Sequence, residues 1–295
     1  MKNILVTGAN GQLGREIQEL SEKYQFFTFF FTDIDTLDIT NYSDLENFFN
    51  NHHIDFVINC AAYTAVDKAE IEKKQAHLIN SVAPKNLTEF TNKHSSKLIH
   101  ISTDYVFDGT NYTPYKESDP VNPNSVYGET KLNGEKEVLR SKNGIIIRTS
   151  WLYSSYGDNF FKTIIKLSSK RKELNVIFDQ VGTPTSAQDL AITILEILAK
   201  TINNPEYFKP GIYHYSNEGV CSWYDFAIEI MEIANINCKI NPVATKDYPL
   251  PANRPHYCVL NKTKIKSTFE ISIPHWKDSL RNVYKSFIIK NHNFK

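Results

Sequence analysis

The sequence lacks the features that mark nucleic-acid-binding and membrane proteins. Its 295 residues include 33 basic and 33 acidic side chains, so it has no net charge for bulk attraction to a polyanion. No apolar run approaches the roughly 18 residues that a membrane-spanning helix needs, and even the dense run Phe26–Phe31 is interrupted by Thr28. The apolar stretch after Met1 is too short for a signal peptide. We therefore expect neither a nucleic-acid partner nor a membrane partner.

Cysteine is also scarce, and its spacing offers no metal or redox motif. The four cysteines, at positions 60, 221, 238 and 258, form no C-x-x-C pair, and the nine histidines form no H-x-x-x-H pair. Cys60 lies in an apolar strand-like run, where a free cysteine usually fills the core. Few and unpaired cysteines are typical of a reducing compartment. We expect a cytoplasmic protein with no metal ligands of its own.

The first half of the chain alternates between strand-like and helix-like segments. The strand-like runs are Asn3–Thr7, Phe26–Thr32, Asp55–Ala62, Lys97–Thr103 and Gly144–Ser150. Gln12–Lys23 has apolar residues at helical spacing, and Ser43–Glu46 has the capping-box pattern of a helix start. Because continuous apolar runs suit strands that are buried on both faces, the pattern predicts a Rossmann-like, doubly wound α/β domain with a parallel sheet over residues 1–150.

The second half is less regular and predicts a smaller lobe. Val176–Phe178 is a strand candidate, and Asp189–Lys200 and Ser222–Ala234 are helix candidates. Several prolines between Pro242 and Pro255 exclude a long helix there and favour a wrapping loop. We expect a substrate-binding lobe formed mainly by residues 151–295, with an open boundary because the first domain could borrow later segments.

A glycine-rich loop follows the first strand-like run. Gly8, Gly11 and Gly14 are spaced G-x-x-G-x-x-G, and they join a predicted strand to a predicted helix. Glycines at this place let the backbone approach a pyrophosphate closely, and the free N–H groups of the helix N-terminus then face the anion. The alternative is an ordinary glycine-rich turn, but the strand–turn–helix context favours a dinucleotide site.

An acidic residue suited to bind the cofactor ribose ends the second strand-like run. Asp33 follows Gly14 by about 20 residues, the distance at which an acid typically accepts hydrogen bonds from the adenosine ribose and repels a 2′-phosphate. Asp35 competes for the same role. Asp38 and Ile39 lie where a loop could flank the adenine. The pattern modestly favours NADH over NADPH.

Two Y-x-x-x-K matches occur, and their context separates them. Pro114 interrupts the match between Tyr112 and Lys116, whereas Tyr127 and Lys131 open a predicted helix that runs to about residue 139. A spacing of four residues puts both side chains on one helix face. We expect the ammonium to lower the pKa of the phenol from about 10, so that Tyr127 can exchange a proton with a substrate oxygen. A solvated surface pair is the alternative.

Thr103 ends a strand-like run of the same domain, and with it the motifs match a known family. Gly8–Gly14, Thr103 and the pair Tyr127 and Lys131 resemble the extended short-chain dehydrogenases/reductases. Longer strings resemble the dTDP-4-dehydrorhamnose reductases within that family, and these are Asn59–Glu70, Ser102–Gly109, Arg148–Tyr153, Asp179–Thr185 and Pro251–Pro255. The resemblance implies reduction of the C4 ketone of dTDP-4-dehydro-L-rhamnose by NADH or NADPH.

The resemblance also implies roles for individual residues. The cofactor pyrophosphate would lie along Gly8, Gly11, Gln12, Leu13 and Gly14. Its adenosine half would be bounded by Asp33, Asp38 and Ile39. The rest of the cofactor would lie along Ala62, Tyr63 and Thr64. Tyr127 would donate the proton, Lys131 would hold the nicotinamide ribose, and Thr103 would tune the phenol. Thr103, Asp104, Trp151 and Arg254 would contact the sugar nucleotide. For Trp151 a core position is the alternative, and for Arg254 a contact that pins the proline-rich loop.

The resemblance leaves other readings open. Relatives on this scaffold include a non-catalytic regulatory subunit, sugar-nucleotide dehydratases and epimerases, and some relatives bind Mg²⁺ at a contact between subunits of a homodimer. The dehydratases carry an Asp-Glu pair after the threonine, whereas Thr103 is followed by Asp104 and Tyr105. We therefore expect ketone reduction without 4,6-dehydration, unless a distant residue such as Glu117 replaces the missing glutamate.

Overall fold

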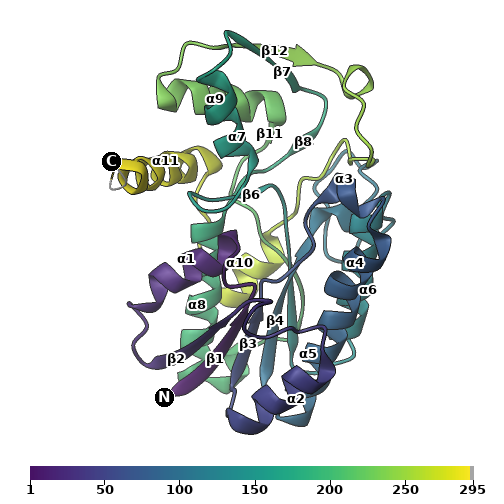
Figure 1. Cartoon of the computed structure of the whole chain (residues 1–295), viewed down its shortest axis with the longest axis vertical. Coiled ribbons are helices and arrows are strands. Elements are labelled where there is room, and N and C mark those ends of the chain that lie inside the picture. Colours follow the sequence, from purple (N-terminus) through teal and green to yellow (C-terminus); the bar gives the residue numbers. More distant parts are fainter. Residues whose placement is uncertain (293–295) are drawn as a thin grey trace.

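The computed structural model describes residues 1–292 and has a parallel six-stranded sheet at its centre (Figure 1). The strands are ordered β10-β5-β4-β3-β1-β2, and all five neighbouring pairs are parallel. Their bounds are β1 Lys2–Thr7, β2 Phe27–Thr32, β3 Phe56–Asn59, β4 Lys97–Thr103, β5 Gly144–Thr149 and β10 Gly211–His214. The expectation of a Rossmann-like α/β fold is confirmed.

Helices cover both faces of this sheet (Figure 1). One face packs on α1 Gln12–Ser21, α8 Ala187–Asn203 and α10 Thr263–Phe269, and the other on α2 Tyr42–Asn51, α5 Ala83–Lys93 and α6 Val126–Val138. Successive residues of β1 alternate between the two layers: Ile4 and Val6 belong to the first core and Leu5 to the second. Burial on both faces explains why the strands are continuously apolar.

The sheet draws on the second half of the chain. Strand β10 pairs with β5, so that Gly211–His214 lies beside Ile145–Arg148. Helix α8 packs on α1 and contributes Leu190, Ile194 and Leu198 to the core of that face. Without β10, the fully buried strand β5 would be an edge strand with unpaired backbone groups.

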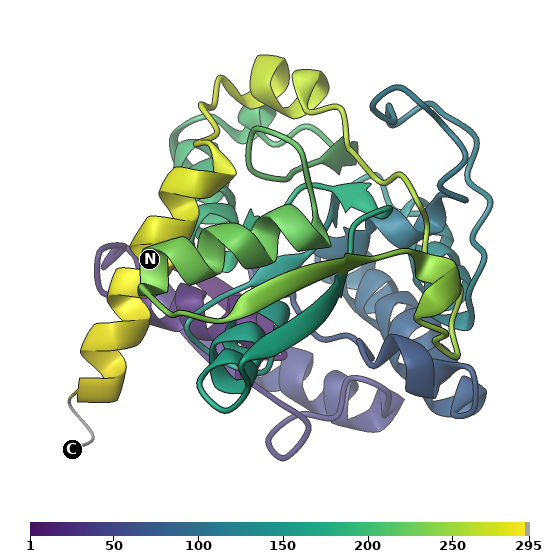
Figure 2. The ribbon, with the colours of Figure 1, turned by 90° about the horizontal axis from the view of Figure 1, so that it is seen from above.

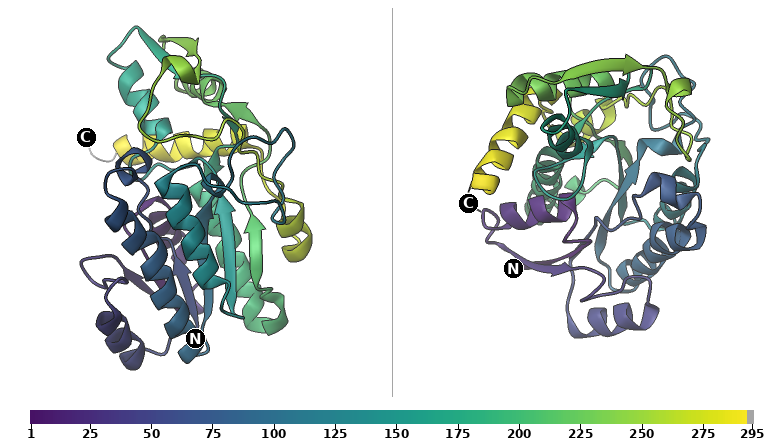
Figure 3. Two further views of the ribbon diagram at one scale, coloured as in Figure 1. Left: turned by 90° about the vertical axis from the view of Figure 1, so that its right-hand side faces the viewer. Right: turned by 45° about the horizontal axis from the view of Figure 1, so that its top comes forward.

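A second lobe lies above the carboxyl ends of the strands (Figures 1 and 3). Its parallel pair β7 Glu173–Ile177 and β12 Lys239–Val243 crosses the top of the molecule (Figure 2). Its helices are α7 Phe160–Ser168, α9 Trp223–Ala234 and α11 Trp276–His292. These elements enclose a separate apolar core that includes Phe161, Phe226 and Leu280.

Short elements connect the two lobes. Two-residue strands pair as β6 Leu152–Tyr153 with β9 Thr185–Ser186, and as β8 Val181–Gly182 with β11 Cys221–Ser222. Helices α3 Val66–Ala69 and α4 Lys73–His77 lead through a π-helical turn, Leu78–Val82, into α5. Single 3₁₀ turns lie at Asp104–Val106, Pro205–Tyr207 and Thr245–Asp247. Within residues 1–292, no helix is both long enough and apolar enough to cross a membrane.

One local expectation is wrong. Helix α2 is capped by Asn41 and not by a box at Ser43, because the Asn41 side chain accepts hydrogen bonds from the backbone N–H groups of Ser43 and Asp44. Asparagine directly before Tyr42 is an effective N-cap, so the helix begins earlier than the Ser43–Glu46 pattern predicted. A true capping box occurs instead at the start of α9, where Ser222 and Asp225 exchange hydrogen bonds.

Candidate functional site

The largest gathering of predicted residues surrounds a cavity at the carboxyl ends of the strands. This reaction cavity has a volume of about 550 Å³, a size typical of ligand sites. Its predicted lining residues are Gly8, Gly11, Gln12, Leu13, Ala62, Thr64, Thr103, Asp104, Tyr127, Lys131 and Trp151. Parallel strands bring these residues to one edge of the sheet, which is where α/β proteins bind ligands.

The glycine loop has the geometry of a phosphate-binding turn. Gly8 has φ +66°, and a Cβ there would lie 2.6 Å from the backbone nitrogen of Ala61. Gly14 lies outside the cavity, where a Cβ would lie 2.5 Å from the Gly8 carbonyl oxygen, so it permits α1 to pack closely on the loop. The N-cap Gly11 offers no side-chain acceptor, which leaves N–H groups of the first turn free for an anion. The loop therefore fits a dinucleotide pyrophosphate.

A second cavity, the side cavity, continues from the glycine loop toward β2. It has a volume of about 410 Å³ and shares Gly8, Gly11, Cys60 and Ala62 with the reaction cavity. Its lining includes the predicted residues Asp33, Asp38 and Ile39, whereas Asp35 is exposed outside it. Oδ2 of Asp33 accepts a 2.9 Å hydrogen bond from the Asn10 N–H, so this carboxylate also holds the glycine loop.

Tyr127 is held over the reaction cavity by the first turn of α6. The Ser125 side chain caps the helix by accepting a hydrogen bond from the Gly128 N–H. A Cβ at Gly128 would lie 2.2 Å from the Tyr105 carbonyl oxygen, so only glycine lets this helix end approach the end of β4. The Tyr105 and Tyr127 rings then meet edge to face at 5.4 Å.

The expected lowering of the Tyr127 pKa is wrong. Burial raises the pKa of the phenol to about 12, against the lowering effect of a hydrogen bond with Thr103. The Lys131 ammonium donates to the Ile101 carbonyl oxygen at 2.6 Å instead of facing the phenol. Lys131 is itself only 1% exposed, and burial lowers its pKa to about 8. At neutral pH Tyr127 therefore keeps its proton, which is the state in which a phenol can act as a general acid.

Asp104 is an unusual group beside this phenol. It is 2% exposed, and burial raises the pKa of its carboxyl to about 6. Oδ1 accepts a 3.0 Å hydrogen bond from the Thr103 hydroxyl, and a hydrogen bond with the Cys258 thiol also favours the charged carboxylate. Because Asp104 lines the reaction cavity, its carboxyl is suited to accept a hydrogen bond from a ligand hydroxyl.

A buried ion pair joins helix α6, which carries Tyr127 and Lys131, to strand β5. Arg148 on β5 binds Glu135 on α6 through two hydrogen bonds of 2.7 and 2.9 Å, and both side chains are almost fully buried. The Ser102 hydroxyl donates to the same carboxylate at 2.5 Å. Glu135 lies one helical turn beyond Lys131, and its charge raises the pKa of that lysine against the effect of burial.

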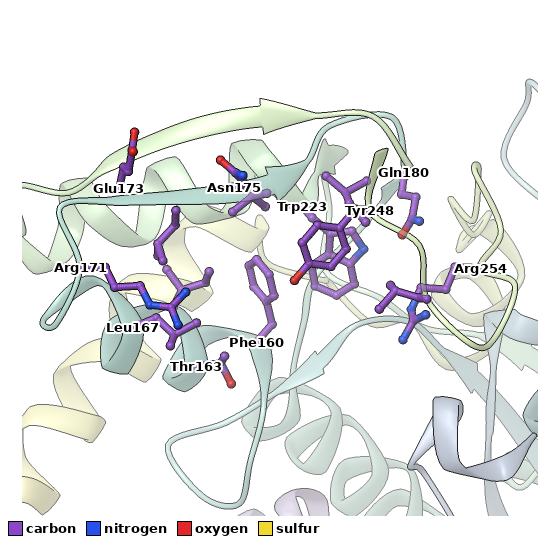
Figure 4. A pocket seen from close by; sticks show the side chains of 15 residues that line it. Phe160, Thr163, Leu167, Arg171, Glu173, Asn175, Gln180, Trp223, Tyr248 and Arg254 are labelled. Carbon is purple, nitrogen blue, oxygen red and sulfur yellow. The ribbon is translucent and has the colours of Figure 1, made fainter. Parts of the chain in front are cut away.

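A third cavity, the upper cavity, lies in the second lobe. It has a volume of about 580 Å³ between α7, β7 and the loop after β12. Figure 4 shows Phe160, Trp223 and Tyr248 gathered near its middle, Arg171 and Glu173 toward one end, and Gln180 and Arg254 toward the other. Aromatic walls with a few charged groups suit a planar, anionic ligand such as a nucleotide.

Arg254 has a structural contact in addition to its place at this cavity. Its guanidinium binds both carboxylate oxygens of Asp67, at 2.7 and 3.1 Å, and so fixes the loop after β12 to α3. This contact lowers the pKa of the Asp67 carboxyl. The side chain thus pins the loop, as one interpretation of the sequence had it, and it also lines the upper cavity, where the other interpretation requires it to be.

Several sequence candidates lie away from the cavities. The Tyr63 hydroxyl donates a hydrogen bond to Glu72, and Tyr63 does not line the reaction cavity. Tyr112 is 90% exposed, so the Y-x-x-x-K match of Tyr112 and Lys116 lies on the surface. Cys60, expected as a core residue, packs on the core but also lines the reaction and side cavities, and burial raises the pKa of its thiol.

Sequence reasoning missed the second-lobe contributors to the site. Asn159, Phe160, Trp223 and Tyr248 line the cavities, yet no motif links them to the residues around Thr103. The one available signal was the placement of Trp223 at a predicted helix start. Among residues 1–292, no group of three histidine, cysteine, aspartate or glutamate side chains is arranged to hold a metal.

The fold and the site together define a nucleotide-binding oxidoreductase of the Rossmann type. The chain belongs to the family described as RmlD substrate binding domain, which matches residues 1–289. It is 40% identical over 291 residues to a dTDP-4-dehydrorhamnose reductase of Aggregatibacter actinomycetemcomitans, with 96% of this chain and 98% of the relative covered. The resemblance inferred from the motifs is thus confirmed.

Solved structures agree with this assignment. A dTDP-4-dehydrorhamnose reductase of Clostridium acetobutylicum has a TM-score of 0.91 and 44% identity, covering 97% of this chain and 99% of the other. One of Bacillus anthracis, solved in complex with NADP, has a TM-score of 0.91 and 36% identity, covering 97% and 100%. A nicotinamide cofactor is therefore consistent both with this relative's bound NADP and with the geometry of the glycine loop.

Proposed function

We propose that this protein reduces the C4 ketone of dTDP-4-dehydro-L-rhamnose to give dTDP-L-rhamnose, with NADH or NADPH as reductant, in the last step of dTDP-rhamnose synthesis. The observation that carries the proposal is that Thr103, Tyr127 and Lys131 line the same cavity as the glycine loop. An acid for the ketone oxygen and a site for the nicotinamide cofactor are thereby adjacent. When bound, the cofactor supplies the hydride to C4.

The residues of the chain supply the proton and the positioning. Tyr127 donates its proton to the C4 oxygen, and its raised pKa makes proton loss in the resting state unfavourable. Lys131 holds the nicotinamide ribose, and Asp33 the adenosine ribose, beside the glycine loop. Asp104 and Trp151 contact the sugar in the reaction cavity. The nucleoside diphosphate lies in the upper cavity, with Arg254 near its phosphates.

The arrangement around Thr103 disfavours the dehydratase alternative. Tyr105 occupies the place of the second acid, and burial raises the pKa of its phenol, so it is a poor base at neutral pH. Glu117 accepts a 3.0 Å hydrogen bond from the His214 N–H on β10 and does not line the reaction cavity. The intact set of Thr103, Tyr127 and Lys131 also disfavours a purely regulatory role.

A direct assay separates the alternatives. Purified protein incubated with the 4-keto sugar nucleotide and NADH or NADPH should consume one reduced cofactor for each dTDP-L-rhamnose formed. The same protein with dTDP-glucose and oxidised cofactor should give no 4-keto-6-deoxy product. Formation of that product would establish a dehydratase, and absence of turnover on the keto sugar would favour a binding protein.

The proposed setting is the cytoplasm, where four free cysteines remain reduced. A sugar nucleotide is the proposed partner, with no nucleic acid or membrane surface involved. A homodimer, with or without Mg²⁺ at its contact, is an alternative to a monomer. Light scattering after size-exclusion chromatography, with and without EDTA, measures the molar mass and its dependence on metal.

A further inference from the structure

One side chain belongs to the walls of both cavities that the proposed function assigns to a sugar nucleotide. Of the residues that the structure describes, Trp223 is the one that lines both the reaction cavity and the upper cavity. If the nucleotide lies in the upper cavity and the keto carbon at Tyr127, as the proposed function requires, the ligand has to pass this indole.

A second indole packs against that of Trp223. The ring centroids of Trp151 and Trp223 are 3.6 Å apart and their planes differ by 11°, so the two rings lie flat against each other. The Phe160 ring lies 4.6 Å from that of Trp223. Face-to-face contact at this distance leaves no room for another ring between the two indoles. We call Trp151 and Trp223 the indole stack.

The backbone on both sides holds the indole stack in place. Trp151 has φ +47°, a left-handed conformation that costs free energy for a bulky residue. A Cβ at Gly182 would lie 2.8 Å from Cε2 of Trp151, so glycine makes room for this ring. Trp223 is the first residue of α9, which the capping box of Ser222 and Asp225 fixes. Strain retained at a cavity wall is typical of a functional element.

We propose that the indole stack opens when a sugar nucleotide binds, and that the face of Trp223 then carries the hexose ring and holds C4 at Tyr127. Both indoles are only half-buried and both line the reaction cavity, so there is open space into which one ring can turn. Filling the upper cavity with the nucleotide alone leaves the indole stack closed. The sugar is the part of the ligand that opens it, which makes Trp223 a determinant of sugar positioning in the proposed reaction.

Fluorine NMR can observe the indole stack directly because the chain has three tryptophans. In protein labelled with 5-fluorotryptophan, phenylalanine substitutions assign the signals of Trp151, Trp223 and Trp276. The product dTDP-L-rhamnose should shift the signals of Trp151 and Trp223. Oxidised NADP and dTDP, each alone, should shift the signal of Trp223 less than the product does, because dTDP touches this indole in the upper cavity without separating it from Trp151. Trp276, 3% exposed in the core of the second lobe, is the internal reference.

Kinetics supply the second readout. Trp223→Ala should raise the KM for the keto sugar nucleotide about tenfold, the loss expected for one aromatic contact, while the KM for NADPH stays unchanged. Tyr224→Ala changes the next residue of α9, which lines neither cavity, and should leave both KM values unchanged. Equal effects of the two substitutions would indicate that α9 is disturbed as a whole and would overturn the role of Trp223.

The outcomes separate this inference from the proposed function. If the wild-type protein reduces the keto sugar but dTDP-L-rhamnose leaves the Trp223 signal unmoved, the indole stack does not open and the inference is wrong. If dTDP alone moves that signal as far as the product does, the nucleotide and not the sugar opens the indole stack, which also overturns the inference. A wild-type protein that does not reduce the keto sugar overturns the proposed function, and the inference with it.

Discussion

Thr103 and Asp104 are adjacent in the chain, and their side chains are joined by a 3.0 Å hydrogen bond from the threonine hydroxyl to the carboxylate. Thr103 also hydrogen-bonds Tyr127. Its hydroxyl therefore links the buried carboxylate to the proposed proton donor. Burial makes the charged form of Asp104 unfavourable, against the effect of its hydrogen bonds with Cys258 and Thr103. We therefore expect the protonation of Asp104 to affect the stability of the fold as well as the properties of the site.

The first prediction concerns the pH dependence of stability. The pKa of Asp104 is raised from 3.8 to about 6 in the folded protein, so the folded state holds this proton more tightly than the unfolded state. The stability that this group contributes is complete below about pH 4, and it is lost as the pH rises to about 6. Asp104→Asn removes the titrating carboxyl, so the variant does not lose this stability as the pH rises. The free energy of unfolding of the variant relative to wild type should rise by roughly 2–3 kcal/mol between pH 4 and 7.

Urea unfolding at several pH values measures this difference. Asp35→Asn changes an exposed carboxylate outside the cavities and serves as the matched control. A constant offset between Asp104→Asn and wild type over this pH range would show that the Asp104 carboxyl titrates as it does in the unfolded chain.

The second prediction concerns the proton donor. Tyr127→Phe should lower kcat by roughly 10²–10⁴-fold, because the general acid is lost, while the Kd for NADPH stays near the wild-type value. Single-turnover kinetics and cofactor fluorescence measure the two quantities. Tyr112→Phe removes the hydroxyl of the exposed Y-x-x-x-K match and should change neither. A Tyr127→Phe variant with near wild-type turnover would require another acid in the cavity.

The third prediction concerns cofactor preference. The wild-type enzyme should modestly prefer NADH, since Asp33 lines the side cavity where the adenosine ribose is proposed to lie. Asp33→Ala should weaken both cofactors, because the carboxylate also holds the Asn10 N–H, but it should narrow the ratio of kcat/KM between NADH and NADPH. Asp35→Ala should leave the ratio unchanged. A strong wild-type preference for NADPH would show that another group governs this end of the cofactor.

The fourth prediction concerns the buried ion pair between Arg148 and Glu135 on helix α6. Arg148→Met leaves the buried Glu135 carboxylate without its partner and should lower the free energy of unfolding by about 3–5 kcal/mol. The double substitution Arg148→Met with Glu135→Leu should recover much of this loss, because the Glu135 carboxylate is then no longer buried without its guanidinium partner.

A surface pair provides the control for this prediction. Arg140 and Glu137 are also within hydrogen-bond distance, but Arg140 is largely exposed. Arg140→Met should change stability by less than about 1 kcal/mol. Thermal or urea unfolding measures all three variants, and a double substitution that is no more stable than Arg148→Met alone would contradict the electrostatic explanation.

The features that the sequence alone could predict are those that depend on neighbouring residues. Continuous apolar runs identified β1 to β5 because strands buried on both faces need them. The glycine spacing at Gly8–Gly14 identified the phosphate loop because backbone approach and a helix start are local properties. Helical spacing distinguished Tyr127 and Lys131 from the proline-interrupted pair. Each of these inferences needed only a few consecutive residues.

Tertiary structure decided what depends on residues distant in the chain. β10 joins the sheet because the buried strand β5 needs a partner, which no local pattern reveals. The pKa of Tyr127 rises because burial outweighs a lysine whose ammonium is bound to Ile101. The indole stack exists because a strained backbone at Trp151 and a capped helix start at Trp223 meet between two cavities. Burial and long-range contact are properties of the whole fold, so the sequence by itself determined the chemistry available to the site, and packing determined how that chemistry is arranged.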